Sequence, residues 1–272
     1  MFVLFDIGGT NMRVGASADG QTISQSKIIP TPQGFTDGVK QLKQIAQKLS
    51  EGEEITGVAG GIAGALDKTK SILVASPHLT GWVNQPLKVE LERIFDCRVE
   101  LENDANLNGL GEAVNGSGKG KKVVAMITLG TGVGGARIVD SKLDKNIWGF
   151  EPGHQVIIPE GNLCNCGGKG HLEAYVAGSY LEKIYQKKAE DIKDDAVWDQ
   201  IAKYLSIGLN NLTVFWSPEV IILGGSMIKS LPFEKVRTYL KAELKIFPTP
   251  PKIVLATLGD EAGLYGALEL LK

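Results

Sequence analysis

Two turns of small residues, each placed after an apolar run, could bind the phosphates of a nucleotide. The residues of these turns are Gly8, Gly9, Thr10, Gly130, Thr131 and Gly132. Glycine leaves backbone N–H groups unobstructed, and threonine adds a hydroxyl donor. Asp6, at the end of the first apolar run, could hold Mg²⁺ through water, because Mg²⁺ binds one or two carboxylates and keeps the rest of its water shell. The alternative is a pair of plain hairpin turns.

Gly130, Gly132 and Gly135 also match the G-x-G-x-x-G pattern of dinucleotide-binding proteins. That pattern requires a helix after the glycines. The segment 136–139 is instead short and β-branched, which is typical of the returning strand of a hairpin. The chain also contains no G-x-x-x-x-G-K-[ST] motif. Phosphate binding by hairpin turns is therefore favoured over a nicotinamide or flavin enzyme.

Three cysteines, Cys97, Cys164 and Cys166, are too few for a disulfide framework. Cys164 and Cys166 are separated by one residue, and a disulfide across that spacing would be strained. The pair therefore indicates a metal site or free thiols.

Strands and helices alternate in the elements that must position these residues. Apolar residues at helical spacing, such as Val39, Leu42 and Ile45, predict a helix that Gly52 ends. The expected strands are 2–5, 11–16, 55–62, 98–101, 123–129 and 220–223, and the expected helices are 36–49, 86–95 and 105–114. Asp104 therefore stands at the start of a predicted helix.

A glycine- and lysine-rich stretch, 115–122, predicts a domain boundary. The segments LFDIGGTNMRVGA and MITLGTGVGGARI both fit a strand, a small turn with threonine, and a returning strand, and each opens its half of the chain. This weak repeat indicates two related domains facing a common cleft.

The composition is that of an ordinary globular protein, with 272 residues, 43% hydrophobic and 22% charged. It excludes a disordered tail, a collagen and a coiled coil. A net charge of −2 provides no basic field for nucleic acid or an anionic membrane. The chain has no basic leader and no apolar run of about eighteen residues, so we expect a cytoplasmic protein without a membrane or nucleic-acid partner.

Six motifs, in this order and spacing, resemble those of the ROK family of sugar kinases and sugar-responsive repressors. They are DIGGTN (6–11), LENDAN (101–106), TLGTGVGG (128–135), EPGH (151–154), CNCGGKGHLE (164–173) and ILGGS (222–226). The resemblance covers nearly the whole chain and implies an α/β, two-domain actin-like, hexokinase-type (ribonuclease H-like) ATPase fold with an active-site cleft between the domains. The expected domains are 1–117, joined by the C-terminal helix 261–272, and 118–260, which carries a zinc loop. The resemblance also implies a homodimer.

The activity that the resemblance implies is an ATP- and Mg²⁺-dependent transfer of phosphate to the 6-hydroxyl of glucose or a similar hexose. Asp104 matches the family's catalytic aspartate and would act as general base, in a position where the helix macrodipole favours a carboxylate. Its local alternative is an ordinary helix N-cap. Asn103 would bind sugar hydroxyls, because an amide both donates and accepts hydrogen bonds.

Two other functions stay open. One is a kinase for N-acetylmannosamine or N-acetylglucosamine that uses the same residues. The other is a sugar-responsive repressor without catalysis. Those repressors carry an N-terminal helix-turn-helix domain, whereas this chain reaches its first core strand at Phe2, which favours a kinase.

The resemblance assigns further positions to the sugar and the nucleotide. Glu151, His154 and Glu173 match sugar-contacting residues, with solvated surface glutamates as the alternative for the two carboxylates. Gly64 and His78 lie in segments near the sugar pocket where this chain departs from the family, which usually has asparagine at position 78; a loop histidine without ligand contact is the alternative there. The expected nucleotide-binding positions are Asp6, Gly8, Gly9, Thr10, Asn11, Gly130, Thr131, Gly132, Gly224 and Gly225.

The resemblance also implies a structural zinc site. The family takes one histidine and three cysteines, and the matching positions here are His154, Cys164, Cys166 and His171. The third cysteine is thus a histidine. Zn²⁺ accepts a tetrahedral Cys₂His₂ set, so we expect zinc to fix the loop that carries Glu173. A metal-free loop with buried thiols and an exposed His171 is the alternative.

Overall fold

The computed structural model describes residues 1–272, and the chain forms two compact units. The first unit contains Met1–Lys119, Leu143–Gly149 and Leu258–Lys272, and the second contains Gly120–Lys142 and Phe150–Thr257. The expected domain boundaries placed residues 143–149 in the second domain, whereas in the structure they lie in the first unit.

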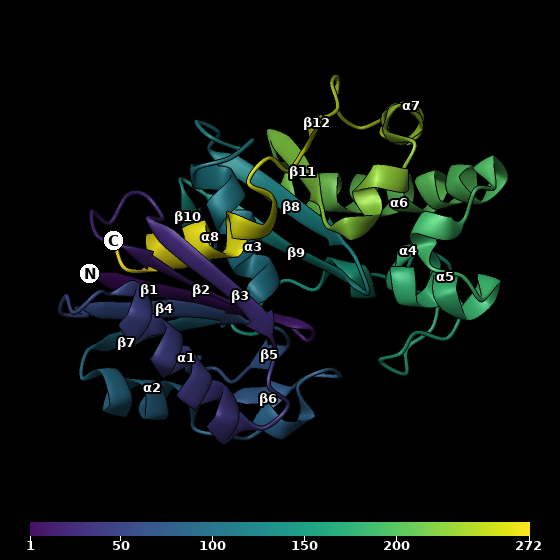
Figure 1. Ribbon diagram of the computed structural model, residues 1–272. Coiled ribbons are helices and arrows are strands. Elements are labelled where there is room, and N and C mark those ends of the chain that lie inside the picture. The colour runs from purple at the N-terminus through teal and green to yellow at the C-terminus, as the bar shows by residue number, and fades with distance from the viewer. The chain divides into compact units, whose positions relative to one another are not determined.

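The first unit contains a five-stranded mixed sheet in the order β3-β2-β1-β4-β7 (Figure 1). The strands are β1 (Phe2–Ile7), β2 (Asn11–Ser17), β3 (Gln25–Pro30), β4 (Gly57–Ile62) and β7 (Arg98–Asn103). β1, β2 and β3 form an antiparallel meander, while β4 and β7 run parallel to β1. β1 and β7 are each two residues longer than predicted, and β3 was not predicted. The longer β1 contains Asp6, which is the next-to-last residue of the strand.

Both faces of this sheet are covered by helices. Successive side chains of β1 alternate between the faces. Val3, Phe5 and Ile7 belong to the core formed with α1 and α2, while Leu4 packs with Leu264 and residues of α3 and α8. The helices are α1 (Phe35–Leu49), α2 (Leu87–Phe95), α3 (Asp104–Val114) and α8 (Ala262–Leu270). Figure 1 shows α1 and α2 on one side of the sheet and α3 with α8 on the other.

α3 and α8 cross at glycines, so their backbones touch. A Cβ atom on Gly266 would lie 1.9 Å from the carbonyl oxygen of Leu107, and one on Gly111 would lie 2.1 Å from that of Ala262. No side chain fits at these points, since backbone atoms cannot move aside as a flexible side chain can.

We therefore expect Gly266→Ala to lower the free energy of unfolding by about 1–3 kcal/mol, because overpacking forces the two helices apart. Urea denaturation would measure this. Gly34→Ala is the matched control, because a Cβ there meets nothing within 4 Å. Equal stability of the two variants would contradict the crossing described here.

The second unit contains another five-stranded sheet, in the order β10-β9-β8-β11-β12. The strands are β8 (Val123–Leu129), β9 (Val133–Val139), β10 (Lys142–Leu143), β11 (Val220–Gly224) and β12 (Lys252–Leu255). β9 returns antiparallel to β8 directly after the glycine turn, so the predicted hairpin is confirmed and no helix follows these glycines. β11 runs parallel to β8 and β12.

The helices of the second unit form its core with this sheet. They are α4 (Glu173–Val176), α5 (Gly178–Tyr185), α6 (Asp195–Trp216) and α7 (Phe233–Glu243). The long helix α6 begins at an N-cap, Asp194, whose carboxylate accepts from the N–H of Ala196 at 2.9 Å. α6 buries Leu205 and Leu209 against this core.

The remaining elements are short. They are β5 (Ala65–Leu66), β6 (Leu73–Ala75) and the 3₁₀ turns η1 (Thr80–Trp82), η2 (Pro152–His154), η3 (Ala189–Asp191), η4 (Ser226–Ser230) and η5 (Gly259–Glu261).

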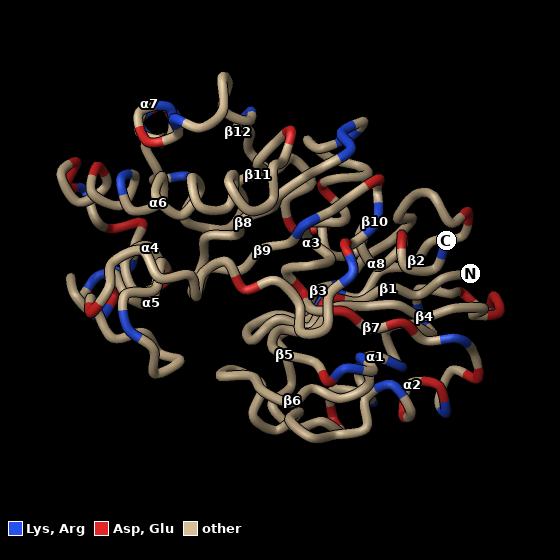
Figure 2. Tube along the Cα trace, turned by 180° about the vertical axis from the view of Figure 1, so that it is seen from behind, with Lys and Arg blue, Asp and Glu red and all other residues tan.

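Figure 2 shows basic and acidic residues interspersed along α2 and α7, where Arg93 pairs with Glu90 and Arg237 with Glu234. None of the helices is both long and apolar enough to span a membrane.

Candidate active site

The turn between β1 and β2 is closed by hydrogen bonds that leave part of its backbone open. The N–H of Gly8 donates to the carbonyl of Asn11 at 3.0 Å. Thr31 donates to the other carbonyls of the turn, through its hydroxyl to Gly8 at 2.6 Å and through its N–H to Thr10 at 2.9 Å. The N–H groups of Gly9 and Thr10 have no partner within the protein. Donors of this kind suit a phosphate.

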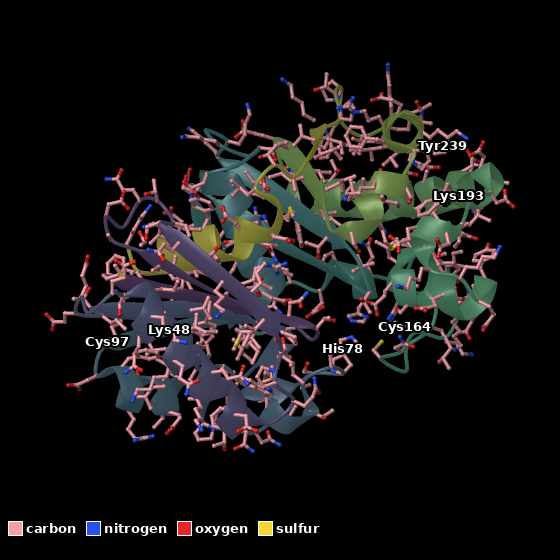
Figure 3. The ribbon with its side chains drawn as sticks, in the orientation of Figure 1. Lys48, His78, Cys97, Cys164, Lys193 and Tyr239 are labelled. Atoms are coloured by element: carbon pink, nitrogen blue, oxygen red, sulfur yellow. The ribbon has the colours of Figure 1, made fainter.

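His78 packs against this turn. A Cβ atom on Gly9 would lie 2.6 Å from the Cβ of His78, which stands in the exposed loop between β6 and η1 (Figure 3). The resemblance placed His78 near the sugar pocket. The structure brings it to Gly9, so its nearest candidate-site neighbour is a residue expected to bind nucleotide.

Asp6 is a buried carboxylate with one cation nearby. It lies opposite Arg13 in the β1–β2 pair, and Arg13 Nη1 is 3.9 Å from Asp6 Oδ2, while Nη2 is 3.0 Å from Asp260. Burial, and then the negative charge of Asp104, raise the pKa of Asp6 to about 7, and Arg13 offsets part of this rise. Two carboxylates that disfavour each other's ionisation fit a divalent cation, which would relieve the repulsion. Arg13 was missed in the sequence, although hairpin register could have placed it opposite Asp6.

Asp104 begins α3, at the end of β7. The N-cap of α3 is Asn103, whose side-chain oxygen accepts from the N–H of Asn106 at 3.1 Å, so the N-cap interpretation of Asp104 is wrong. The helix also starts one residue earlier than predicted. Burial raises the pKa of Asp104, while the N–H of Ala105 opposes this rise. A carboxylate with a raised pKa is a better proton acceptor, as a general base must be.

Both the nitrogen and the oxygen of the Asn103 side-chain amide already form hydrogen bonds. Its nitrogen donates to the carbonyl of Gly64 at 3.0 Å, and its oxygen caps α3. The Asp104 carboxylate accepts from this amide as well, so a ligand hydroxyl would use the remaining lone pair of the oxygen or replace one of these partners. Gly64 has φ +132°, and a Cβ there would lie 2.3 Å from the carbonyl of Ala75, which requires glycine.

The turn between β8 and β9, in the second unit, is tied to the start of α5. Gly178 N–H donates to the carbonyl of Gly130 at 2.8 Å, and the Ser179 hydroxyl donates to that of Thr131 at 2.6 Å. Glu173 Oε2 accepts from the N–H of Val133 at 2.9 Å. Glu173 is therefore held at the start of β9 rather than solvated.

Gly225 follows β11 with φ +95°, and a Cβ on it would lie 2.2 Å from the carbonyl of Leu129. A Cβ on Gly224 would lie 2.6 Å from Met126 Cε. The close approach of β11 and β8 is thus a packing reason for both glycines.

Four side chains that could bind a metal ion lie close together before α4. The ligand atoms of His154, Cys164, Cys166 and His171 all lie within 4.8 Å of one another. Cys164 Sγ is 3.7 Å from His154 Nδ1, and Cys166 Sγ is 3.2 Å from His171 Nδ1. Bonds of about 2.0–2.3 Å to a tetrahedral zinc place neighbouring ligand atoms roughly 3.3–3.8 Å apart, so these separations fit zinc. Figure 3 shows Cys164 in this loop.

Of the three sugar-binding candidates of the second unit, His154 belongs to this cluster, and Glu151 and Glu173 lie beside it. His154 Nε2, the nitrogen that does not face Cys164, is 3.9 Å from the exposed Glu151 carboxylate. Glu173 Oε1 accepts from the Cys164 thiol at 3.6 Å. Burial raises the pKa of that thiol to about 11 in the metal-free chain, and a bound cation would reverse this effect.

The family model of ROK proteins matches residues 3–272. The chain belongs to the ROK family. It is 28% identical to the glucokinase of Thermotoga maritima over 98% of this chain and 96% of that protein. It is 29% identical to the N-acetyl-D-glucosamine kinase of Vibrio atlanticus, over 98% of each.

Two solved ROK structures resemble this ROK protein over almost their full length. The ROK hexokinase from Thermus thermophilus aligns with a TM-score of 0.88 at 30% identity, covering 98% of this chain and 96% of that one. A glucokinase from Streptomyces griseus, in complex with glucose and AMPPNP, aligns with a TM-score of 0.81 at 28% identity, covering 99% and 98%. The predicted actin-like, hexokinase-type fold is thus confirmed.

Proposed function

We propose that this ROK protein is an ATP-dependent hexose kinase that transfers the γ-phosphoryl group to the 6-hydroxyl of glucose or a similar hexose. The observation that carries the proposal is the junction of β7 and α3, where Asp104, with a raised pKa, is hydrogen-bonded to the side-chain amide of Asn103. The names of the similar glucokinases and hexokinase support this activity.

Asp104 accepts the proton of the attacking hydroxyl. Proton transfer to a positioned base contributes about 10²–10⁴-fold to a rate, most effectively when the pKa of the base lies near the working pH. Asn103 orients the sugar by donating to one hydroxyl and accepting from another. Glu151, His154 and Glu173 accept from further sugar hydroxyls, and Gly64 and His78 belong to the segments that shape the sugar's surroundings.

The two glycine turns bind the triphosphate. The open N–H groups of Gly9 and Thr10 donate to phosphate oxygens, as does the Thr10 hydroxyl, and Asn11 follows them at the start of β2. Gly130, Thr131 and Gly132 serve the same ligand, and Gly224 and Gly225 approach the nucleoside. Asp6 would hold Mg²⁺ through water, and the ion would supply charge neutralisation at the transferring phosphate.

The second unit binds one structural zinc ion through His154, Cys164, Cys166 and His171. The donor set and the spacing of the ligand atoms support this assignment. These four residues would hold the ion, and the bound zinc would fix the loop that leads to Glu173. Homodimer formation is a further prediction, and sedimentation velocity would test it.

The second candidate activity is phosphorylation of N-acetylglucosamine or N-acetylmannosamine. The similarity to the Vibrio atlanticus kinase favours it. The same base and turns would serve both reactions, so the difference lies in the surroundings of the sugar's 2-position.

A coupled assay with Mg-ATP and a panel of glucose, mannose, fructose, N-acetylmannosamine and N-acetylglucosamine tests the proposal. We expect the highest kcat/KM on glucose or another unsubstituted hexose. A preference for an acetylated sugar would establish the second candidate instead. Absence of phosphoryl transfer to every sugar, with sugar binding retained, would reject a kinase and favour a sugar sensor.

A further inference from the structure

We propose that the buried carboxylate of Glu102, paired with the partly exposed Lys70, positions Asn103 and Asp104 for phosphoryl transfer. The inference rests on the proposed kinase activity. Glu102 is a positioning residue, because it acts through the two residues that follow it in the chain.

Glu102 is the last side chain of β7 before the candidate site, and it is only 4% exposed. Its Oε1 accepts from the N–H of Asn103 at 2.9 Å and from the side-chain nitrogen of Asn106 at 3.0 Å. Its Oε2 accepts from Lys70 Nζ. Both carboxylate oxygens are therefore used.

These bonds close a ring around the start of α3. Asn106, which is 1% exposed, donates its side chain to Glu102 and its backbone N–H to the side chain of Asn103. Asp104 lies between the two asparagines in the chain. One carboxylate thus holds the backbone N–H of the residue before the proposed base and the side chain of Asn106 after it.

Lys70 contacts Glu102 from the β5–β6 turn, which is closed by several hydrogen bonds. Asp67 accepts from the N–H groups of Ser71 at 2.6 Å and Ile72 at 2.9 Å. The same residue accepts from the N–H of Lys70 through its carbonyl at 2.9 Å, and Lys70 has the left-handed φ of +52°. The β5–β6 turn therefore presents the ammonium group in a set conformation.

Packing alone does not explain why the buried residue at position 102 of β7 is a carboxylate. Val99 and Leu101 of the same strand are apolar and buried, and an apolar residue at position 102 would avoid the desolvation of a carboxylate. A carboxylate at position 102 can accept from Asn103, Asn106 and Lys70 together, which no apolar side chain can do. These hydrogen bonds align Asn103 and Asp104.

The test combines Glu102→Gln, Lys70→Met and the double variant. A glutamine still accepts from Asn103 and Asn106 but turns its NH₂ group toward the lysine ammonium, where two donors meet. Misplacing a reacting group by about 1 Å costs on the order of 10²-fold in rate. We expect Glu102→Gln to lower kcat about 10–100-fold with little change in the KM for ATP.

Removing the ammonium as well relieves the donor–donor contact, so we expect the double variant to regain most of the lost kcat. A residue that only stabilises the fold would not show this rescue. Lys68→Met, in the same turn but exposed, is the matched control and should keep the parental kcat. Thermal melting of each variant corrects kcat for the folded fraction.

Three results would overturn the inference. One is an unchanged kcat in Glu102→Gln, another is a loss fully explained by unfolding, and the third is a double variant no better than Glu102→Gln. An active parent protein with any of these results rejects the positioning role alone. A parent protein that phosphorylates no sugar rejects the proposed function, and this inference with it.

Discussion

Asp104→Asn is expected to lower kcat by about 10²–10⁴-fold while sugar binding is retained. The amide has almost the same shape as the carboxylate, but it cannot take the proton of the attacking hydroxyl. Because Asn103 rather than Asp104 caps α3, the helix should keep its N-terminus in this variant. Coupled kinetics give kcat, and quenching of tryptophan fluorescence by sugar gives the dissociation constant.

The pH dependence of the rate provides a second test of Asp104 as the general base. Burial raises the pKa of Asp104, and a general base works only when ionised, so the rate of the parent protein should fall as the pH drops through that raised pKa. The Asp104→Asn variant should not show this fall in rate at low pH. Asp96→Asn makes the same chemical change at an exposed aspartate and should leave the profile unaltered. A variant at position 104 with the parental rate and profile would disprove the mechanism.

Cys166→Ser is expected to abolish zinc binding in the second unit, lowering the content from about one ion per chain to almost none. A ligand present at about 100 times its dissociation constant stabilises the folded state by about 2.7 kcal/mol, so the loss should exceed 2 kcal/mol. Strand pairing in the loop before α4 is limited to two isolated bridges, Val156 with His171 and Leu163 with Lys169. Elemental analysis and thermal melting measure the two effects.

Cys97→Ser provides the control for the zinc experiment. Cys97 is a half-buried cysteine of the first unit and lies outside the four-residue cluster, so its loss should leave the zinc content unchanged. A chelator should lower the melting temperature of the parent protein and of Cys97→Ser, but not that of Cys166→Ser. Purified parent protein without zinc, and with no response to added zinc, would refute the metal site.

The sequence pattern predicted those elements whose side chains face one core. The helix 35–49 and the strand 57–62 were placed within two residues at each end, because their apolar residues follow the period of the element. β3 was missed because it is an edge strand with mostly exposed side chains, so no apolar alternation marks it. The C-terminal helix 261–272, which the family resemblance implied, begins one residue before α8 and ends two residues after it.

The candidate-site residues that lie within one short motif could be predicted from the sequence. The four zinc-binding candidates lie within one loop, and the structure brings their ligand atoms together. Glu102 and Lys70 were not singled out, because they are 32 residues apart and only the folding of the β5–β6 turn onto β7 brings them together. The contact of His78 with Gly9 depends in the same way on a loop conformation that local spacing does not encode.

The crossing of α3 and α8 has a consequence for synthesis of the protein. α8 is the last helix of the chain, yet Leu264, Ala267 and Leu268 cover Leu4 and the face of the first sheet around it. That face stays open to water until α8 has left the ribosome. The first unit therefore cannot complete its folding before α8 has been synthesised, and its apolar surface needs protection from aggregation until then.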